Sequence, residues 1–193
     1  MTTIMTRWSR SNNMVKGIMI LADGFEETEA VATKDILDRT HDIVVDLVSL
    51  TERKEVHSSQ NLVVFLEKAL PSLETKDYDF IVLPGGKVGM ENLKGNPLVR
   101  KLLLDFYQEG KLVSAICASP SILGELGILK GKKYTCFPGF QSKDGDYLNV
   151  PAVKDENVIT GHSMAYSLDF GMAIVRYFLG EEGVLKVLPG TNG

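Results

Sequence analysis

Short apolar runs alternate with helical patterns along most of this 193-residue chain. Runs of aliphatic and β-branched residues predict strands at 15–22, 43–50, 80–83, 112–116, 133–136 and 158–160, and a hairpin-like stretch at 56–66. Helical spacing predicts helices at 26–39, 88–109, 118–126 and 166–179. Several strands are apolar throughout, which is typical of parallel sheets covered on both faces. We therefore predict an α/β fold, a three-layer α/β/α sandwich with a mostly parallel sheet.

Length, charge and composition exclude several classes of protein. The length and the lack of repeats or long linkers predict a single domain over 14–193. A net charge of −4 without a Lys/Arg cluster argues against a nucleic-acid partner. No apolar run approaches the roughly 20 residues of a membrane span. The two cysteines fit a reducing compartment, so we expect a cytoplasmic protein that does not bind membranes.

Residues 1–13 differ from the rest of the chain. They contain Arg7 and Arg10 and several Ser and Thr residues but no acidic residue. Three interpretations stay open: an organelle-targeting leader, a disordered segment, or an upstream start with Met14 as the working initiator.

The strand predicted at 112–116 runs directly into Cys117, which is followed by small residues and a helical pattern. Such a junction is typical of a nucleophile elbow, in which a sharp turn lifts a reactive side chain out of the sheet. A helix beginning at Ala118 would stabilise the thiolate and lower the pKa of Cys117. The alternative interpretation is a small cysteine buried in the core.

Acidic residues follow the first predicted strand, at the sheet edge where Cys117 is expected. Glu26 and Glu27 fit a capping role, because acids are favoured in the first turn of a helix. Glu29, three residues after Glu26, need not lie on the solvent-facing side of this helix with Glu26. A carboxyl turned into the cleft would have a raised pKa and could act as a general acid or base.

The strand at 80–83 is followed by Gly85 and Gly86, whose flexibility allows backbone N–H groups to turn inward and bind an oxyanion. His162 follows the last predicted strand and so lies at the same edge. It is either a further group of the site, an exposed loop residue or a neighbour of a helix cap. Acidic residues, His and Cys are not spaced as metal ligands, so we predict no metal.

Three motifs, taken together, resemble the ThiJ/PfpI superfamily. They are Phe-Glu-Glu-Thr-Glu-Ala at 25–30, Val-Leu-Pro-Gly-Gly at 82–86 with Gly89, Asn92 and Leu93, and Ser-Ala-Ile-Cys-Ala at 114–118. The similarity runs from about residue 14 to residue 179 and is greatest to the branch of the parkinsonism-associated protein deglycase and glyoxalase III-like enzymes. The resemblance implies a flavodoxin-like fold, a homodimer and chemistry without a cofactor.

The resemblance also implies roles for individual residues. Cys117 is the nucleophile, Glu29 is the carboxyl hydrogen-bonded to its sulfur, and the amides of Gly86 and Ala118 are oxyanion donors. Related chains often carry a His where this one has Phe137, so a Cys–His pair cannot come from that position, although His162 could substitute. Ala118 also replaces the His that follows the nucleophile in protease-like members, which argues against peptidase activity.

Two residues stay ambiguous. Cys136 is either a resolving thiol for an oxidised Cys117 or a buried core residue. Arg39 either binds an anion near the site or interacts with the C-terminal dipole of its helix.

The function expected from these residues is cofactor-independent detoxification of reactive dicarbonyls. The glyoxalase III and deglycase activities of the family imply conversion of methylglyoxal to lactate and repair of early glycation adducts. The alternative is a redox-sensing oxidative-stress protein or chaperone, in which Cys117 is oxidised to a sulfinate.

Overall fold

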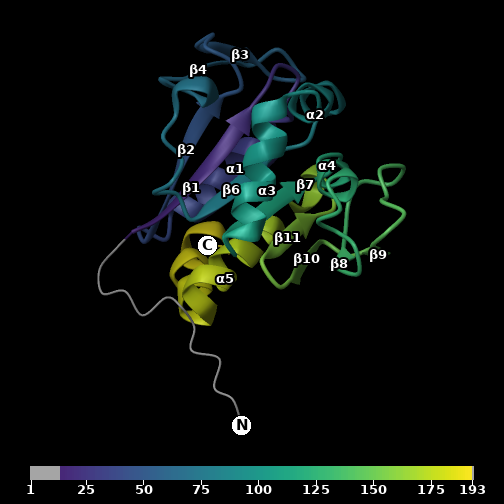
Figure 1. Cartoon of the computed structure of the whole chain (residues 1–193). Helices are drawn as coiled ribbons and strands as arrows, with labels where there is room; N and C mark the ends of the chain where they lie inside the picture. Colours follow the sequence, from purple (N-terminus) through teal and green to yellow (C-terminus); the bar gives the residue numbers. More distant parts are fainter. Residues whose placement is uncertain (1–13, 193) are drawn as a thin grey trace.

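The computed structural model describes residues 14–192 and shows a sheet between two layers of helices (Figure 1). The main sheet has the strand order β10–β11–β7–β6–β1–β2–β5. Its strands are β1 (Val15–Leu21), β2 (Ile43–Ser49), β5 (Lys68–Ala69), β6 (Phe80–Leu83), β7 (Leu112–Ile116), β10 (Ala152–Asp155) and β11 (Val158–Gly161). All neighbours are parallel except β10 and β11. The predicted α/β sandwich is confirmed, whereas the interpretations of residues 1–13 lie outside the described residues.

Both faces of the sheet are covered. Residues of β1 alternate between two apolar clusters, with Ile18 and Ile20 in one and Met19 and Leu21 in the other. The first cluster includes side chains of α2 (Lys87–Lys94), α3 (Pro97–Gln108) and α4 (Pro120–Glu125), and the second those of α1 (Glu27–Asp38) and α5 (Ser167–Val187). This double burial explains the continuously apolar strand sequences.

The single helix predicted at 88–109 is wrong, because the structure has two helices there. Pro97 lacks a backbone N–H and disfavours a helical conformation in the residue before it. Asn96 has an extended backbone and its side chain accepts hydrogen bonds from the N–H groups of Leu98 and Val99, so it caps the new helix α3.

Other bounds also differ from the predictions. Helix α4 begins at Pro120, not at residue 118, and α5 continues to Val187 across a kink at Gly180, whose φ is 67°. The short strands β5, β9 (Asp146–Tyr147) and β10 and the final helix α6 (Pro189–Asn192) were not predicted from the sequence. Strand β8 is shorter than predicted (Lys133–Tyr134).

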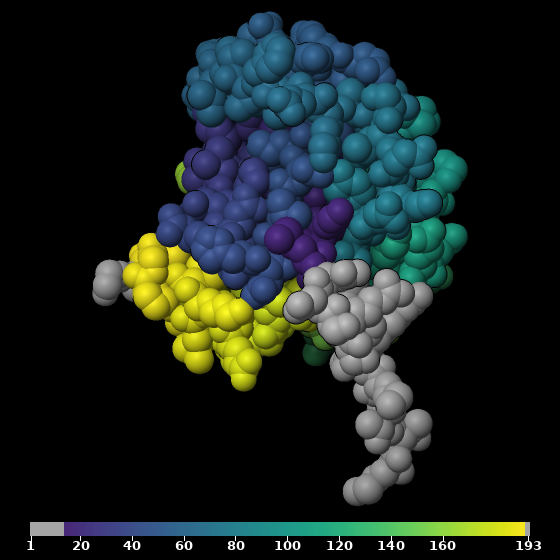
Figure 2. Space-filling view, turned by 90° about the vertical axis from the view of Figure 1, so that its left-hand side faces the viewer, coloured from purple at the N-terminus to yellow at the C-terminus, as the bar shows by residue number. Residues whose placement is uncertain are grey.

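The hairpin-like stretch forms an antiparallel pair, β3 (Glu55–His57) and β4 (Val63–Phe65), outside the main sheet. Figure 2 views the molecule from the side of this hairpin, which projects at the top, with the C-terminal helices in yellow at the bottom. Within residues 14–192, no helix is long and apolar enough to cross a membrane.

Candidate active site

Cys117 occupies a strained turn between β7 and α4. Its φ is 65°, in the left-handed region that is uncommon for a residue with a side chain. The backbone is held on both sides, because Cys117 N–H donates to Gly161 O at 3.0 Å and Phe137 N–H donates to Cys117 O at 2.8 Å. The side chain is half-buried. This geometry is that of the predicted elbow, in which neighbouring segments maintain the strain.

Glu29 lies in the first turn of α1, and its side chain is 1% exposed. Glu26 caps this helix by accepting a hydrogen bond from Glu29 N–H at 2.7 Å, which fits its expected role. One oxygen of Glu29, Oε2, accepts a hydrogen bond from Gly85 N–H at 2.6 Å. The other, Oε1, is buried without a nitrogen or oxygen partner, and the carboxyl interacts with the thiol of Cys117. Glu29 therefore points inward, toward the cysteine.

Gly85 and Gly86, which follow β6, form the third side of the site, beside Cys117 and Glu29. A β-carbon on Gly85 would lie 2.7 Å from both Cys117 Cβ and Glu29 Oε2, which is closer than real β-carbons approach other atoms. Gly86 has a φ of 83°, and its amide and that of Ala118 hydrogen-bond to the Cys117 side chain. The amides were predicted from the sequence, whereas the space that Gly85 leaves open between Cys117 and Glu29 was not. Two consecutive glycines were the only signal for it.

Burial controls the protonation of the Glu29–Cys117 pair. It raises the pKa of Glu29 to about 7, although hydrogen bonds from Gly85 and Cys117 act in the opposite direction. Burial also raises the pKa of the Cys117 thiol, and the charge of Glu29 raises it further, while the amides of Ala118 and Gly86 lower it. The contribution of that charge vanishes when Glu29 holds its proton. The two groups therefore titrate as one unit.

The expectation that a helix N-terminus lowers the pKa of Cys117 is wrong. Helix α4 begins three residues beyond the cysteine, at Pro120, and burial outweighs the nearby amides. A thiolate at this position consequently depends on Glu29 being protonated, because two negative charges in one buried site repel each other.

His162 directly follows β11, and its neighbour Gly161 accepts a hydrogen bond from Cys117 N–H. Gly161 also pairs with Ile116, the residue before Cys117. The His162 ring contacts Ser163 Oγ at 3.2 Å through Nδ1 and packs edge-on against Tyr166, while Nε2 is buried without a hydrogen-bond partner. His162 is thus partly buried and not an exposed loop residue, and it neighbours Ser163, the N-cap of the short helix Met164–Tyr166, as the helix-cap interpretation expected.

Cys136 is fully buried, and burial raises the pKa of its thiol to about 11. It belongs to the cluster on the α2–α4 face of the sheet, whereas Cys117 packs against the cluster on the α1 and α5 face. The arrangement favours the core interpretation of Cys136.

Arg39 lies at the far end of α1 from Glu29 and donates to Asp35 at 2.6 Å. This contact fits the helix-end interpretation. Among residues 14–192, no cluster of His, Cys, Asp or Glu side chains is arranged to hold a metal ion.

Comparison with known proteins identifies the family of the chain. The model of the DJ-1/PfpI family matches residues 15–177. The Parkinson disease protein 7 homolog of Danio rerio is 34% identical over 180 residues, covering 89% of this chain and 94% of the relative. The glutathione-independent glyoxalase DJ-1 of Schizosaccharomyces pombe is 30% identical over 174 residues, covering 84% and 90%.

A solved structure gives the same result for the fold. The crystal structure of Drosophila melanogaster DJ-1beta superposes with a TM-score of 0.87 at 30% identity, covering 92% of this chain and 97% of that one. The chain also matches Protein DJ-1 homolog B of Arabidopsis thaliana at 38% identity over 174 residues, but spans only 40% of that relative's length. The chain belongs to the DJ-1/PfpI family, which confirms the resemblance to the ThiJ/PfpI superfamily.

The close approach at Gly85 generates a first prediction. Gly85→Ala should force Cys117 and Glu29 apart and change the rate at which a thiol reagent modifies Cys117 by at least about tenfold. Gly95→Ala is the matched control, because the nearest atom to its β-carbon would be 3.4 Å away. Mass spectrometry of the alkylated peptides measures both rates. Equal rates in the two variants would show that the contact does not shape the site.

The raised pKa of Glu29 generates a second prediction. The pKa of Glu29 is 4.5 in the unfolded chain and about 7 in the folded protein. Between these two pH values the Glu29 carboxyl is protonated in the folded state and ionised in the unfolded state, so the free energy of unfolding falls as pH rises. Glu29→Gln removes this penalty and should stabilise the protein above pH 7 by up to about 3 kcal/mol, with little effect near pH 4.

Urea unfolding at several pH values measures the effect. Glu26→Gln, which keeps an oxygen able to cap α1 and leaves Glu29 unchanged, is the control and should show the same pH dependence as the wild type. A Glu29→Gln variant that tracks the wild type at every pH would mean that Glu29 is not strained by burial.

Proposed function

We propose that this protein is a cofactor-independent enzyme that converts methylglyoxal and related 1,2-dicarbonyls to hydroxy acids through Cys117. The observation that carries the proposal is the buried Glu29 carboxyl against a half-buried cysteine whose side chain accepts two backbone amides. A nucleophile, a proton carrier and oxyanion donors are the groups that this reaction needs. The glyoxalase named among the relatives supports it.

The reactive form has a protonated Glu29 and a Cys117 thiolate. The sulfur bonds to the aldehyde carbon, and the aldehyde oxygen, held by the Gly86 and Ala118 amides, takes the proton of Glu29 to give a hemithioacetal. The Glu29 carboxylate then carries a proton from that carbon to the neighbouring ketone carbon through an enediol. The product is a lactate thioester, which water hydrolyses to lactate and free thiol. Early glycation adducts would enter through the same hemithioacetal chemistry.

Oxidation of Cys117 is a second function that one observation favours. The amides of Gly86 and Ala118 that would hold an oxyanion could equally hold the oxygens of a sulfinate. A redox-sensing role would leave dicarbonyl turnover incidental. The assay below separates the two, since a redox sensor need not consume methylglyoxal at a useful rate.

The test is methylglyoxal consumption by the purified protein without glutathione. Cys117→Ser should abolish it, and Glu29→Gln should lower it by about two to four orders of magnitude, the size of a lost general acid–base group. Glu26→Gln should do little, and His162→Ala, an auxiliary residue, should cost less than about tenfold. No consumption by the wild type, or equal effects at Glu26 and Glu29, would contradict the proposal.

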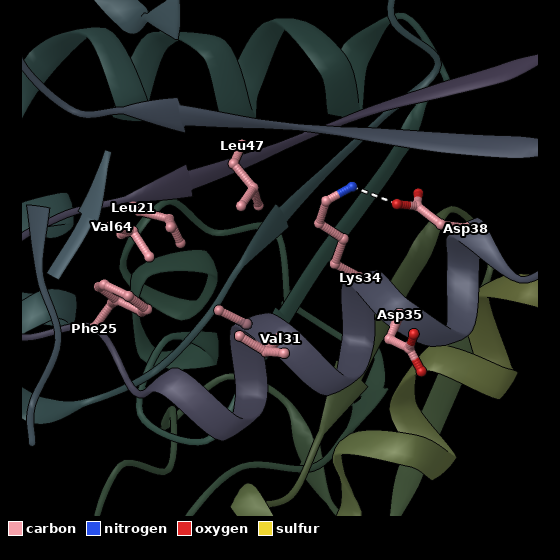
Figure 3. Close-up of a pocket in the computed structure, with 9 residues that line it drawn as sticks. Leu21, Phe25, Val31, Lys34, Asp35, Asp38, Leu47 and Val64 are labelled. Atoms are coloured by element: carbon pink, nitrogen blue, oxygen red, sulfur yellow. Dashed lines mark hydrogen bonds and ion pairs between the residues drawn. The ribbon is translucent and has the colours of Figure 1, made fainter. Parts of the chain in front are cut away.

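We also propose that the protein is a cytoplasmic homodimer, as the family resemblance implies. A cleft of about 260 Å³ runs between α1 and the strands, with Leu21, Leu47 and Val64 on the strand side and Val31 and Lys34 on α1 (Figure 3). It is largely apolar, and Val31 at its edge is 56% exposed.

The charges beside the cleft support a second copy of the chain as its occupant. Lys34 pairs with Asp38 and Arg39 with Asp35 along α1, so both signs lie on one helix face. A twofold interface pairs the same patch of both copies, so a face that carries both signs avoids the repulsion that a face of one sign would meet there.

Sedimentation equilibrium tests the dimer. The wild type should have twice the mass of the chain, and Val31→Asp should be a monomer. Leu98→Asp, an exposed leucine on α3 on the opposite face of the sheet, should stay dimeric. A monomeric wild type would reject the dimer.

A further inference from the structure

Phe137 is fixed directly beside the nucleophile. Its N–H donates to Cys117 O at 2.8 Å, so the two backbones touch. The chain then turns, with Phe140 N–H donating to Phe137 O at 3.1 Å and Gly139 in the left-handed region at a φ of 95°. The hydrogen bonds on both sides of Phe137 leave its backbone little freedom. The direction in which the side chain leaves the backbone is therefore set by the same contacts that hold the elbow.

The Phe137 ring is left at the surface. It is 44% exposed, whereas Phe80 and Phe170 are fully buried. The ring packs edge-on against the ring of Phe140, with the two centroids 6.4 Å apart. An aromatic face thus stays open to solvent on the residue whose backbone is hydrogen-bonded to Cys117, and the thiol of Cys117 is half-buried. Apolar contact with that face would remove unfavourable exposed surface.

We propose that the Phe137 ring forms one wall of the substrate site and makes the enzyme prefer 1,2-dicarbonyls with an aromatic or larger apolar substituent over methylglyoxal. The proposal rests on the dicarbonyl chemistry proposed above for Cys117. When the sulfur bonds to the aldehyde carbon, two carbons separate the sulfur from the substituent on the ketone, and the proposal places that substituent against the Phe137 ring. A methyl group covers little of the ring there, and a phenyl group can pack against it.

The experiment compares kcat/KM for phenylglyoxal and methylglyoxal, which share the reacting carbons and differ in the substituent. The wild type should favour phenylglyoxal. Phe137→Ala should lower this preference by about three- to tenfold, the size of one aromatic contact, and should act mainly on phenylglyoxal. Phe137→Tyr should keep it. Leu98→Ala is the matched control, since Leu98 is also 44% exposed and lies on α3.

A second readout does not depend on turnover. The rates at which iodoacetamide and N-benzyl iodoacetamide alkylate Cys117 are measured in the same variants. The wild type should react faster with the benzyl reagent, and Phe137→Ala should lose this preference while its rate with iodoacetamide stays unchanged. An unchanged rate also shows that the elbow is intact.

Other outcomes overturn one proposal or the other. If Phe137→Ala keeps both preferences, or loses equal activity on both dicarbonyls, the ring is not a wall of the site. If the wild type consumes neither dicarbonyl, the proposed function fails. The alkylation rates then still decide whether Phe137 lines the approach to the sulfur.

Discussion

The buried contact between Glu29 and Cys117 is the interaction on which the site depends. A carboxyl with an exposed fraction of 1% holds its proton to about pH 7 because the interior disfavours its charge. The cysteine shares that interior, so one negative charge is tolerated there and two are not. The sheet, the capped start of α1 and the glycine turn after β6 all bring these two groups together.

Three connections at the carboxyl ends of the strands build the pair. β1 leads into α1 and Glu29, β6 into Gly85 and Gly86, and β7 into Cys117. Side-chain contacts link these connections, since Ser119 Oγ donates to Pro84 O at 2.6 Å and Gly85 N–H donates to Glu29. All three connections position the cysteine, so a substitution in one of them changes the geometry of the Glu29–Cys117 pair.

Local sequence signals predicted the fold class and the elbow, because burial on both sheet faces imposes apolar runs and small residues permit a sharp turn. They failed where a single residue ends an element or where an element is only two residues long. Pro97 divides a continuous helical pattern, and the two-residue strand β5 is too short to leave a pattern. The inward direction of Glu29 was expected, but the space left by Gly85 and the burial that opposes a thiolate are properties of packing. They arise from residues far apart in the chain, and no local pattern encodes them.

The most direct test of a shared proton is the pH dependence of Cys117 alkylation in the wild type and in Glu29→Gln. If the two groups titrate as one unit, the wild-type rate should show two inflections, the lower one at about pH 7 where Glu29 loses its proton. The variant should show a single inflection, shifted below the upper inflection of the wild type because the charge that raises the pKa of the thiol is gone. Superimposable single-step curves for the two proteins would contradict the account.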